Sequence, residues 1–233
     1  MPTSAGKSIC YQVPALALGG LALVVSPLIS LMSDQVTALR QAGVAAACLN
    51  SALGAEERRE VLSQASRGEL TLLYVAPERL DDPAFLDMAS GHGVALLAID
   101  EAHCISQWGN DFRPSYQRIR SFIDALPTRP PVMALTATAT QQVREDIETS
   151  LALRDPLRVV ASFDRPNLSF SVERPSSRAD KNAALLEFAR AREDRSGIVY
   201  CMSRRAVEEV CDSLCEAGLA ATRYHAGLSS EER

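Results

Sequence analysis

Short apolar runs alternate with longer amphipathic segments along most of this chain, and that alternation limits the folds open to it. The runs are continuously apolar, as expected for parallel strands buried on both faces. Strands are predicted at Leu21–Ser26, Ala46–Leu49, Thr71–Val75, Val94–Asp100, Val132–Thr136 and Leu157–Ala161. Helices are predicted at Leu28–Ala42, Ala55–Arg67, Tyr116–Leu126 and Gln141–Leu151. The pattern therefore predicts an α/β domain whose mostly parallel sheet is flanked by helices.

The pattern changes near residue 163. The segment FDRPNLSFSVERPSSR is polar, contains two prolines and one strand-like piece at Leu168–Glu173, and is interpreted as a connector. A second αβ pattern follows, with helices at Asp180–Glu193 and Arg204–Ala217 and strands at Gly197–Cys201 and Ala220–Tyr224. We predict a first domain over residues 1–162, a connector over 163–178 and an incomplete second domain over 179–233. Both ends look cut, because no strand precedes the first residues and the chain stops inside LSSEER, which has the pattern of a helix start.

The composition supports a globular protein. With 233 residues, 47% of them hydrophobic, the chain has ample material for a core. The net charge of −5 argues against a general polyanion-coating protein, although a local groove can still bind nucleic acid. None of the six cysteines forms a CxxC pair, so zinc is not expected. Scattered thiols without a signal peptide indicate a reducing cytoplasm, and apolar runs such as Leu21–Val25 are too short to span a membrane.

The stretch TSAGKS, Thr3–Ser8, ends in the Gly-Lys-Ser of a phosphate-binding loop. Such a loop points backbone N–H groups at phosphate oxygens in front of a helix N-terminus. Gly6 permits close backbone approach, Lys7 supplies a cation, and the Ser8 hydroxyl can ligate Mg²⁺. Met1 stands where the usual pattern has its first glycine, so a chance Gly-Lys-Ser in a loop is the alternative. The residues predicted to bind the nucleotide are Thr3, Ser4, Ala5, Gly6, Lys7 and Ser8.

Two adjacent carboxylates, Asp100 and Glu101, directly follow the apolar run LLAI. The carboxyl end of a parallel strand opens onto the same crevice as a phosphate-binding loop. Asp100 is expected to hold Mg²⁺ there, and Glu101 to orient or deprotonate the attacking water. A solvated acidic strand end is the alternative, and the order of the two motifs argues against it. Lys7, Asp100 and Glu101 are therefore the predicted catalytic residues.

The loop after the carboxylates carries Trp108, Phe112, Arg113 and Tyr116. Aromatic rings together with an arginine suit stacking on unpaired bases. Nucleotide hydrolysis and nucleic-acid contact are thus predicted to lie next to each other. His103 is either a surface histidine or a residue that relays the nucleotide state through hydrogen bonds, and its place in DEAH favours the relay.

Three further loops follow predicted strands. ALTATAT, residues 134–140, has more hydroxyls than a helix cap needs, so Thr136 and Thr138 are predicted to bond the DEAH loop. SPLISLMSDQ, residues 26–35, and APERL, residues 76–80, can hold phosphates of a nucleic-acid backbone. Taken singly, each is more often an ordinary connection between a strand and a helix.

In this order, these pieces resemble the RecQ family of DNA helicases, within superfamily 2. The resemblance covers essentially the whole chain, and its most specific run is the DEAH box continued by ISQWGNDFRPSY. The other matching runs are MPTSAGKSICYQ, VVSPLISLMSDQV, LLYVAPERL, ALTATAT, FDRPNLSFSV, IVYCMSR and YHAGLSSEER. The family's phosphate loop usually reads GGGKS where this chain has Ser4-Ala5-Gly6, and Asn110 and Met202 also depart from the common residues.

The resemblance implies two RecA-like lobes with ATP between them, of which this chain would hold the P-loop lobe and the start of the second. It implies ATP- and Mg²⁺-dependent 3′→5′ unwinding of DNA in replication, recombination and repair, on single-stranded and partly duplex DNA, with no membrane partner and a location at the bacterial nucleoid. By resemblance, the residues that couple DNA to hydrolysis are His103, Gln107, Trp108, Phe112, Arg113, Thr136 and Thr138. Those expected to contact DNA are Ser26, Pro27, Arg79, Trp108 and Arg113.

Two functions of different classes remain open from the sequence. The first is a fragment of an ATP-dependent helicase, expected to show little activity alone because the cleft arginines of the second lobe are not in the sequence. The second is a non-catalytic relative that binds single-stranded DNA or a protein partner. Retention of Lys7, Asp100 and Glu101 favours the first. A P-loop small-molecule kinase fits poorly, because it has no need of the Trp108–Tyr116 loop.

Overall fold

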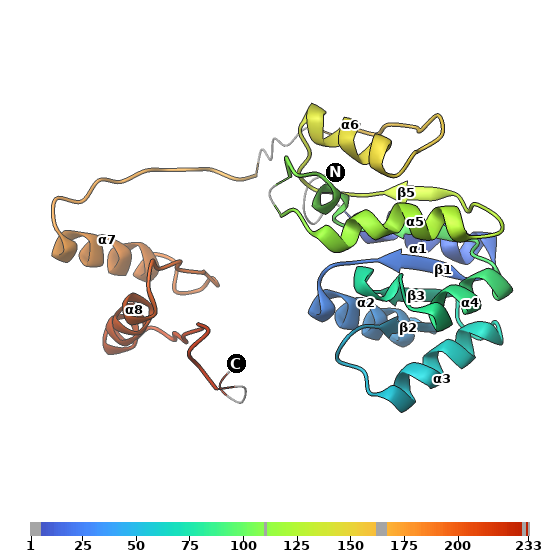
Figure 1. The fold of residues 1–233 in the computed structure, drawn as a ribbon. Coiled ribbons are helices and arrows are strands. Elements are labelled where there is room, and N and C mark those ends of the chain that lie inside the picture. Colours follow the sequence, from blue (N-terminus) through green and yellow to red (C-terminus); the bar gives the residue numbers. More distant parts are fainter. Residues whose placement is uncertain (1–5, 110, 162–166, 230–231, 233) are drawn as a thin grey trace. The chain divides into compact units, whose positions relative to one another are not determined.

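The computed structural model describes residues 6–109, 111–161, 167–229 and 232 (Figure 1). Contacts between Cα atoms divide the chain into two compact units, Met1–Arg165 and Pro166–Arg233, which are described separately. The boundary falls within the predicted connector. The three-part division at residues 162 and 178 stays a prediction.

A five-stranded parallel sheet forms the centre of the first unit, in the order β2-β3-β1-β4-β5. The strands are β1 (Ala22–Val25), β2 (Ala46–Leu49), β3 (Leu72–Val75), β4 (Leu96–Ile99) and β5 (Val132–Ala134). In the centre of the sheet, Leu23 of β1 is in register with Leu73 of β3 and with Leu97 of β4. All five match predicted runs, and the predicted α/β class with a mostly parallel sheet is confirmed.

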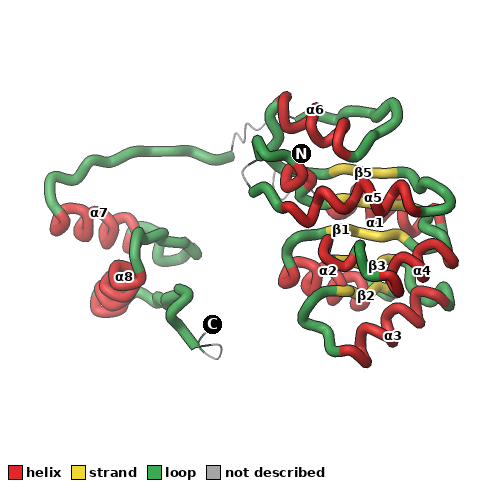
Figure 2. Tube along the Cα trace, viewed as in Figure 1, coloured by secondary structure: helices red, strands yellow, loops and turns green. Residues whose placement is uncertain are grey.

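Helices cover both faces of this sheet, as Figures 1 and 2 show. They are α1 (Lys7–Leu18), α2 (Ile29–Gln41), α3 (Ala55–Ser66), α4 (Pro83–His92), α5 (Arg118–Ala125) and α6 (Gln141–Ser150). Buried side chains of α1 and α2 pack with Val24, Tyr74 and Ala98 on one face. Those of α3, α4, α5 and α6 pack with Leu23 and Leu97 on the other. The alternate residues of each strand therefore serve two cores, which is why the strand sequences are continuously apolar.

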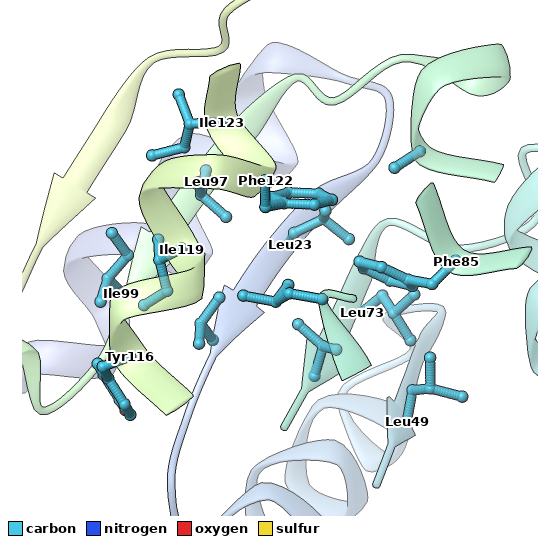
Figure 3. Packing of buried hydrophobic residues seen from close by; sticks show 14 of the residues in the cluster. Leu23, Leu49, Leu73, Phe85, Leu97, Ile99, Tyr116, Ile119, Phe122 and Ile123 are labelled. Carbon is cyan, nitrogen blue, oxygen red and sulfur yellow. The ribbon is translucent and has the colours of Figure 1, made fainter. Parts of the chain in front are cut away.

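The larger core contains a pair of aromatic rings between α4 and α5. Phe85 and Phe122 stack with ring centroids 5.5 Å apart and lie over the leucines of the sheet (Figure 3). This pairing adds to the stabilisation from burial alone. Helix α4 was not predicted from the sequence, although Asp82 caps it by accepting the Ala84 N–H at 3.1 Å and Pro83 opens it.

Two predicted elements of the first unit differ in the structure. The predicted helix Tyr116–Leu126 begins as a 3₁₀ turn, Pro114–Gln117, before α5 starts. The predicted strand Leu157–Ala161 is wrong. This segment is not paired with any described strand, and Leu157 is 91% exposed. Apolar residues alone do not make a strand, because its backbone groups need a hydrogen-bonded neighbour.

The second unit contains helices α7 (Arg178–Arg190) and α8 (Arg204–Glu216), close to the two predicted there. The strands predicted at Gly197–Cys201 and Ala220–Tyr224, and the strand-like piece Leu168–Glu173, are wrong: all three are irregular (Figure 2). Backbone hydrogen bonds do not join them in the described part of this unit, and Tyr200 is 91% exposed. Only Leu214 and Leu228 are buried among its described residues. None of the helices described in either unit has the length and apolar character to cross a membrane.

Candidate nucleotide and nucleic-acid site

The predicted phosphate loop enters α1 through Gly6, whose φ of 75° and ψ of 31° lie in the left-handed region. Glycine adopts this conformation without the steric penalty of a Cβ. Lys7 and Ser8 follow as the first residues of α1, so both stand at a helix N-terminus, where backbone N–H groups and the helix dipole favour an anion. The predicted binding residues Thr3, Ser4 and Ala5 lie outside the described residues, as does Met1.

Asp100 and Glu101 emerge directly from the carboxyl end of β4. Asp100 is 8% exposed, and its Oδ1 accepts the Glu101 backbone N–H at 3.0 Å. Burial, and secondarily the neighbouring Glu101 carboxylate, raises the pKa of Asp100 above its usual range. Glu101 has a φ of 46° and a ψ of 45°, a left-handed conformation that is strained for a residue with a Cβ.

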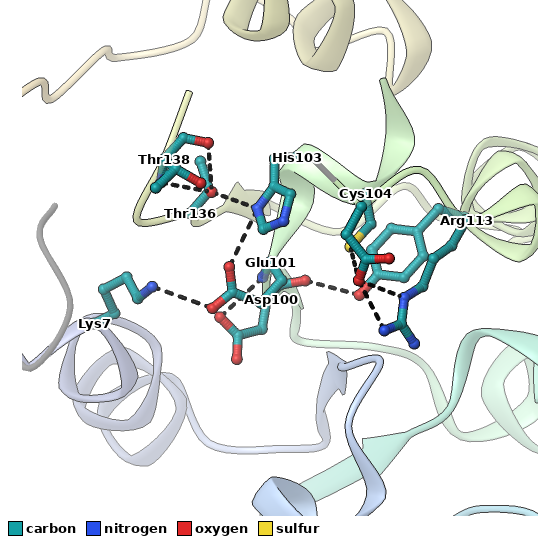
Figure 4. Close-up of polar contacts among 10 residues, drawn as sticks. Lys7, Asp100, Glu101, His103, Cys104, Arg113, Thr136 and Thr138 are labelled. Atoms are coloured by element: carbon teal, nitrogen blue, oxygen red, sulfur yellow. Dashed lines mark hydrogen bonds and ion pairs between the residues drawn. The ribbon is translucent and has the colours of Figure 1, made fainter. Parts of the chain in front are cut away.

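Glu101 joins the phosphate loop to the other strand ends (Figure 4). Its Oε1 lies 3.3 Å from Lys7 Nζ, and its Oε2 lies 3.2 Å from His103 Nδ1. The same His103 nitrogen lies 2.8 Å from Thr136 Oγ1 at the end of β5. Thr136 Oγ1 also accepts the Thr138 N–H at 3.2 Å and donates to the Thr138 carbonyl at 3.2 Å. The structure thus brings together Lys7, Glu101, His103 and the two threonines, which the sequence placed on separate motifs.

The loop that carries Trp108, Phe112, Arg113 and Tyr116 is called the aromatic loop, and Tyr116 anchors its base. Its buried hydroxyl donates to the Asp100 backbone carbonyl at 2.9 Å, and burial raises the pKa of this phenol. The Arg113 N–H donates to the Cys104 carbonyl at 2.9 Å, which closes the loop. Burial also raises the pKa of the Cys104 thiol, to about 11. The base of the loop is therefore fixed against the carboxylate-bearing strand end.

The tip of the loop is open. Trp108 is 69% exposed and Phe112 is 36% exposed, while Gln107 is also exposed. Asn110 lies outside the described residues. Stacking on a nucleic-acid base requires ring faces that are not already packed, and Trp108 meets that requirement.

Arg113 joins the aromatic loop to the start of α2. Its Nη1 donates to the Pro27 carbonyl at 3.0 Å, and its Nε and Nη2 both donate to Asp111 Oδ2, at 2.9 and 2.8 Å. This pairing with Arg113 lowers the pKa of Asp111. Two residues predicted to contact DNA, Pro27 and Arg113, are therefore in direct contact with each other.

The other two predicted DNA contacts differ in their accessibility. Arg79 Nη2 donates to the Asn50 carbonyl at 3.4 Å, beyond the carboxyl ends of β2 and β3. Ser26 is buried, and its hydroxyl has no hydrogen-bond partner among the described residues. In this structure Arg79 lies on the accessible strand-end edge, whereas the Ser26 side chain does not reach the surface.

Sequence reasoning missed several residues that shape the loop. Gly109 is required because a Cβ there would lie 2.3 Å from the His103 carbonyl oxygen. Ser106 Oγ donates to Asp146 Oδ2 at 2.6 Å, a contact across forty positions. Asp111 could have been found from its place two residues before Arg113. Asp146 carries no such signal, because its partner is set only by the packing of α6.

No cluster of three or more His, Cys, Asp or Glu side chains suited to a metal occurs within residues 6–109, 111–161, 167–229 and 232. Mg²⁺ in phosphate-binding proteins, however, uses one or two carboxylates and takes its remaining ligands from phosphates and water. Two side chains fit that donor set: the Asp100 carboxylate and the Ser8 hydroxyl at the start of α1. Burial disfavours the ionised form of Asp100, and a bound cation would offset that cost.

Three comparisons bear on this arrangement. The DEAD/DEAH box helicase family model matches residues 1–147. ATP-dependent DNA helicase RecQ of Haemophilus influenzae is 44% identical over all 233 residues, and RecQ of Bacillus subtilis is also 44% identical over 233 residues. The chain spans 37% and 39% of the lengths of these relatives.

Among solved structures, Mycobacterium smegmatis helicase Lhr bound to ssDNA and AMP-PNP superposes with a TM-score of 0.67 at 19% identity, covering 100% of this chain and 34% of that one. The DUF1998 helicase MrfA bound to DNA and AMPPNP gives 0.66 at 17% identity, covering 93% of this chain and 33% of that one. At these identities the likeness concerns the fold.

Proposed function

This chain belongs to the DEAD/DEAH box helicase family and, within it, to the RecQ type, and we propose that it carries the nucleotide-hydrolysing lobe of an ATP-dependent DNA helicase. The observation that carries the proposal is the convergence of three side chains at the carboxyl end of the sheet: Glu101 lies 3.3 Å from Lys7 through Oε1 and 3.2 Å from His103 through Oε2. Nucleotide hydrolysis needs, among its parts, a cation that binds phosphate and a carboxylate that orients water. His103 adds a link from this carboxylate to the next strand end.

Each residue has a distinct task in this proposal. The N-terminus of α1 and Lys7 bind the ATP phosphates. Ser8 and Asp100 are the residues to hold Mg²⁺, which when bound supplies charge neutralisation at the β- and γ-phosphate oxygens. Glu101 orients the attacking water and accepts its proton. Because Lys7 is paired with Glu101, phosphate oxygens compete for Lys7, and their binding frees the carboxylate for that task.

The DNA contact is proposed for the neighbouring loop. Trp108 and Phe112 offer rings for stacking on unpaired bases, and Arg113 and Arg79 offer cations for the backbone. His103 precedes this loop and contacts both Glu101 and Thr136. A movement of Glu101 on nucleotide binding is therefore transmitted through His103 to the loop that contacts DNA. The names of the RecQ relatives, and the DNA and AMP-PNP bound to Lhr and MrfA, support DNA and ATP as partners.

The finer assignments rest on the resemblance of the sequence motifs to the RecQ family. We propose 3′→5′ movement on single-stranded and partly duplex DNA, with a role in recombination and repair. A protein acting in this way on a bacterial chromosome works in the cytoplasm, at the nucleoid.

Nucleotide binding by the purified chain tests the proposal. Lys7→Ala should weaken binding of a fluorescent ATP analogue by at least about tenfold, because it removes a charge-assisted contact to phosphate. Lys181→Ala is the matched control, since Lys181 is exposed on α7 and should leave affinity unchanged. Equal affinity of Lys7→Ala and the unsubstituted chain would refute the proposed site.

Glu101→Gln separates hydrolysis from simple binding. The amide retains the size of the carboxylate but cannot accept a proton from water, so ATP turnover in the full-length protein should fall by roughly 10²–10⁴ while nucleotide affinity is kept. A non-catalytic DNA-binding protein would bind DNA equally well before and after the change and show no turnover in either form.

A further inference from the structure

Ser106 lies at the base of the aromatic loop and is nearly inaccessible, with 1% of its surface exposed. Its hydroxyl makes two hydrogen bonds of opposite sense: Oγ donates to Asp146 Oδ2 at 2.6 Å and accepts the Trp108 backbone N–H at 3.2 Å. The carboxylate can only accept, so it fixes where the single hydroxyl proton points. The lone pairs of Oγ are thereby left facing Trp108.

The Trp108 backbone depends on this contact. The Trp108 ring is largely exposed, so packing of the ring contributes little to the position of the residue. The next residue, Gly109, donates its N–H to the Ser106 carbonyl at 3.0 Å. Ser106 therefore holds two successive backbone amides of the loop, one through its side chain and one through its carbonyl.

Asp146 lies on α6. This helix directly follows Thr136, Thr138 and Thr140, which together are called the hydroxyl cluster. Its first turn is capped by Thr140, whose Oγ1 accepts the Val143 N–H at 3.4 Å. The segment from Thr136 to Asp146 consequently meets the start of the aromatic loop at two points. One is Thr136 with His103, and the other is Asp146 with Ser106.

We propose that Asp146 is a positioning residue for Trp108. Acting through the Ser106 hydroxyl, it ties the DNA-contacting loop to the helix behind the hydroxyl cluster, so that a shift of this helix moves Trp108. Two bonds to one segment constrain the loop in both position and rotation, which the His103 contact alone does not. The consequence for DNA-stimulated hydrolysis rests on the proposed function; the consequence for Trp108 does not.

Trp108 is the only tryptophan of the chain, so fluorescence excited at the red edge of the absorption band, where tyrosine does not absorb, reports on this residue alone. Asp146→Ala should release the Ser106 hydroxyl, lower the fluorescence anisotropy of Trp108 and raise its quenching by acrylamide. Asp146→Asn should retain most of the native signal, because its amide oxygen still accepts from Ser106. Glu145→Ala is the matched control, because Glu145 is an acidic, exposed neighbour on α6 whose carboxylate accepts a hydrogen bond from Gln141 and not from Ser106.

Ser106→Ala provides an independent variant if Asp146→Ala does not fold. It should reproduce the change in Trp108 fluorescence, and the double substitution should add nothing to it, because both remove the same chain of bonds. Circular dichroism at the measuring temperature confirms that each variant is folded. Unchanged anisotropy and quenching in folded Asp146→Ala and Ser106→Ala would overturn the proposal.

Activity provides the second readout in the full-length protein. Asp146→Ala should reduce stimulation of ATP hydrolysis by single-stranded DNA roughly tenfold, the effect of losing one positioned hydrogen bond, with basal turnover and KM for ATP unchanged. Full stimulation alongside altered fluorescence would overturn the coupling role. If the unsubstituted protein hydrolyses no ATP, the proposed function fails, and the fluorescence measurement still decides the role of Asp146.

Discussion

Asp100 and Glu101 are adjacent carboxylates with different environments. Asp100 is buried and bonded by a backbone amide, whereas Glu101 is half-buried and placed by its left-handed backbone between a lysine and a histidine. A buried carboxylate whose charge is unfavourable suits a cation, and a reachable carboxylate suits water. The sequence specifies two acids at a strand end, whereas the burial of Asp100 and the left-handed backbone of Glu101 give them different environments.

Asp100→Asn should stabilise the fold near pH 7, because it removes a buried charge while its amide oxygen still accepts the Glu101 N–H. The pKa of Asp100 is raised above its usual value of 3.8 by burial, so the folded state binds this proton more tightly than the unfolded state. The contribution of Asp100 to stability is therefore most favourable below pH 3.8 and falls as the pH rises from there through the folded-state pKa. The gain in the variant should be about 0.5–2 kcal/mol at neutral pH, the usual size of a single stabilising substitution.

Urea unfolding of both forms between about pH 4 and pH 8 measures this effect. The difference in free energy of unfolding should shrink towards the acidic end, as Asp100 becomes protonated first in the folded state and then in the unfolded state. A stability difference independent of pH would mean that the buried charge is not its cause. Mg²⁺-dependent nucleotide binding should be lost in the same variant.

Helix α6 is the element that links the hydroxyl cluster to the aromatic loop, and its start depends on Thr140. Thr140→Ala removes the side-chain acceptor of the Val143 N–H and should lower the free energy of unfolding by about 1 kcal/mol. Thr149→Ala is the matched control on the same helix, because the Thr149 hydroxyl only donates back to the Glu145 carbonyl at 2.9 Å. Urea unfolding should show a smaller loss for this variant, and equal losses would argue against a capping role.

The strands that could be predicted are those whose apolar runs find neighbours on the sheet. Leu21–Ser26 and Val94–Asp100 became β1 and β4 because both faces are covered by helices and both edges are paired. Leu157–Ala161 and Gly197–Cys201 have similar composition but no paired neighbour in the described structure. An apolar composition indicates that a segment favours burial, whereas strand pairing depends on the neighbours that the assembled sheet provides.

The same division applies to the site. Motif spacing identified Lys7, Asp100, Glu101 and His103, since each lies at a strand end or helix start that the topology brings to one edge. The bond between Ser106 and Asp146 was not predictable, because it depends on how α6 packs against the 3₁₀ turn Ala102–Ile105. The local sequence determines which functional side chains stand at strand ends and helix starts. Tertiary packing determines which other side chains hydrogen-bond to the loops that carry them.

At the scale of the whole molecule, the two units differ in how much surface they bury. The first has two cores, one on each face of a paired sheet. In the described residues of the second, α7 buries no side chain and α8 buries Leu214 alone. Helices of this length are marginally stable without a packed apolar face. The RecQ-type assignment covers the entire chain, but the stability of the fold resides in the first unit.

Hydrogen exchange should therefore divide the chain in two. Amides of α7 and α8 are expected to exchange far faster than those of β1 and β4, because local opening of the second unit exposes little buried apolar surface. Point variants make the same distinction: Phe85→Ala should cost about 3–5 kcal/mol of unfolding free energy by leaving a cavity beside Phe122, whereas Leu214→Ala should leave the main unfolding transition unchanged. Mass spectrometry resolves the exchange by segment, and urea unfolding measures the variants. Protection of α8 equal to that of β4 would show that the second unit shares the cooperative core of the first.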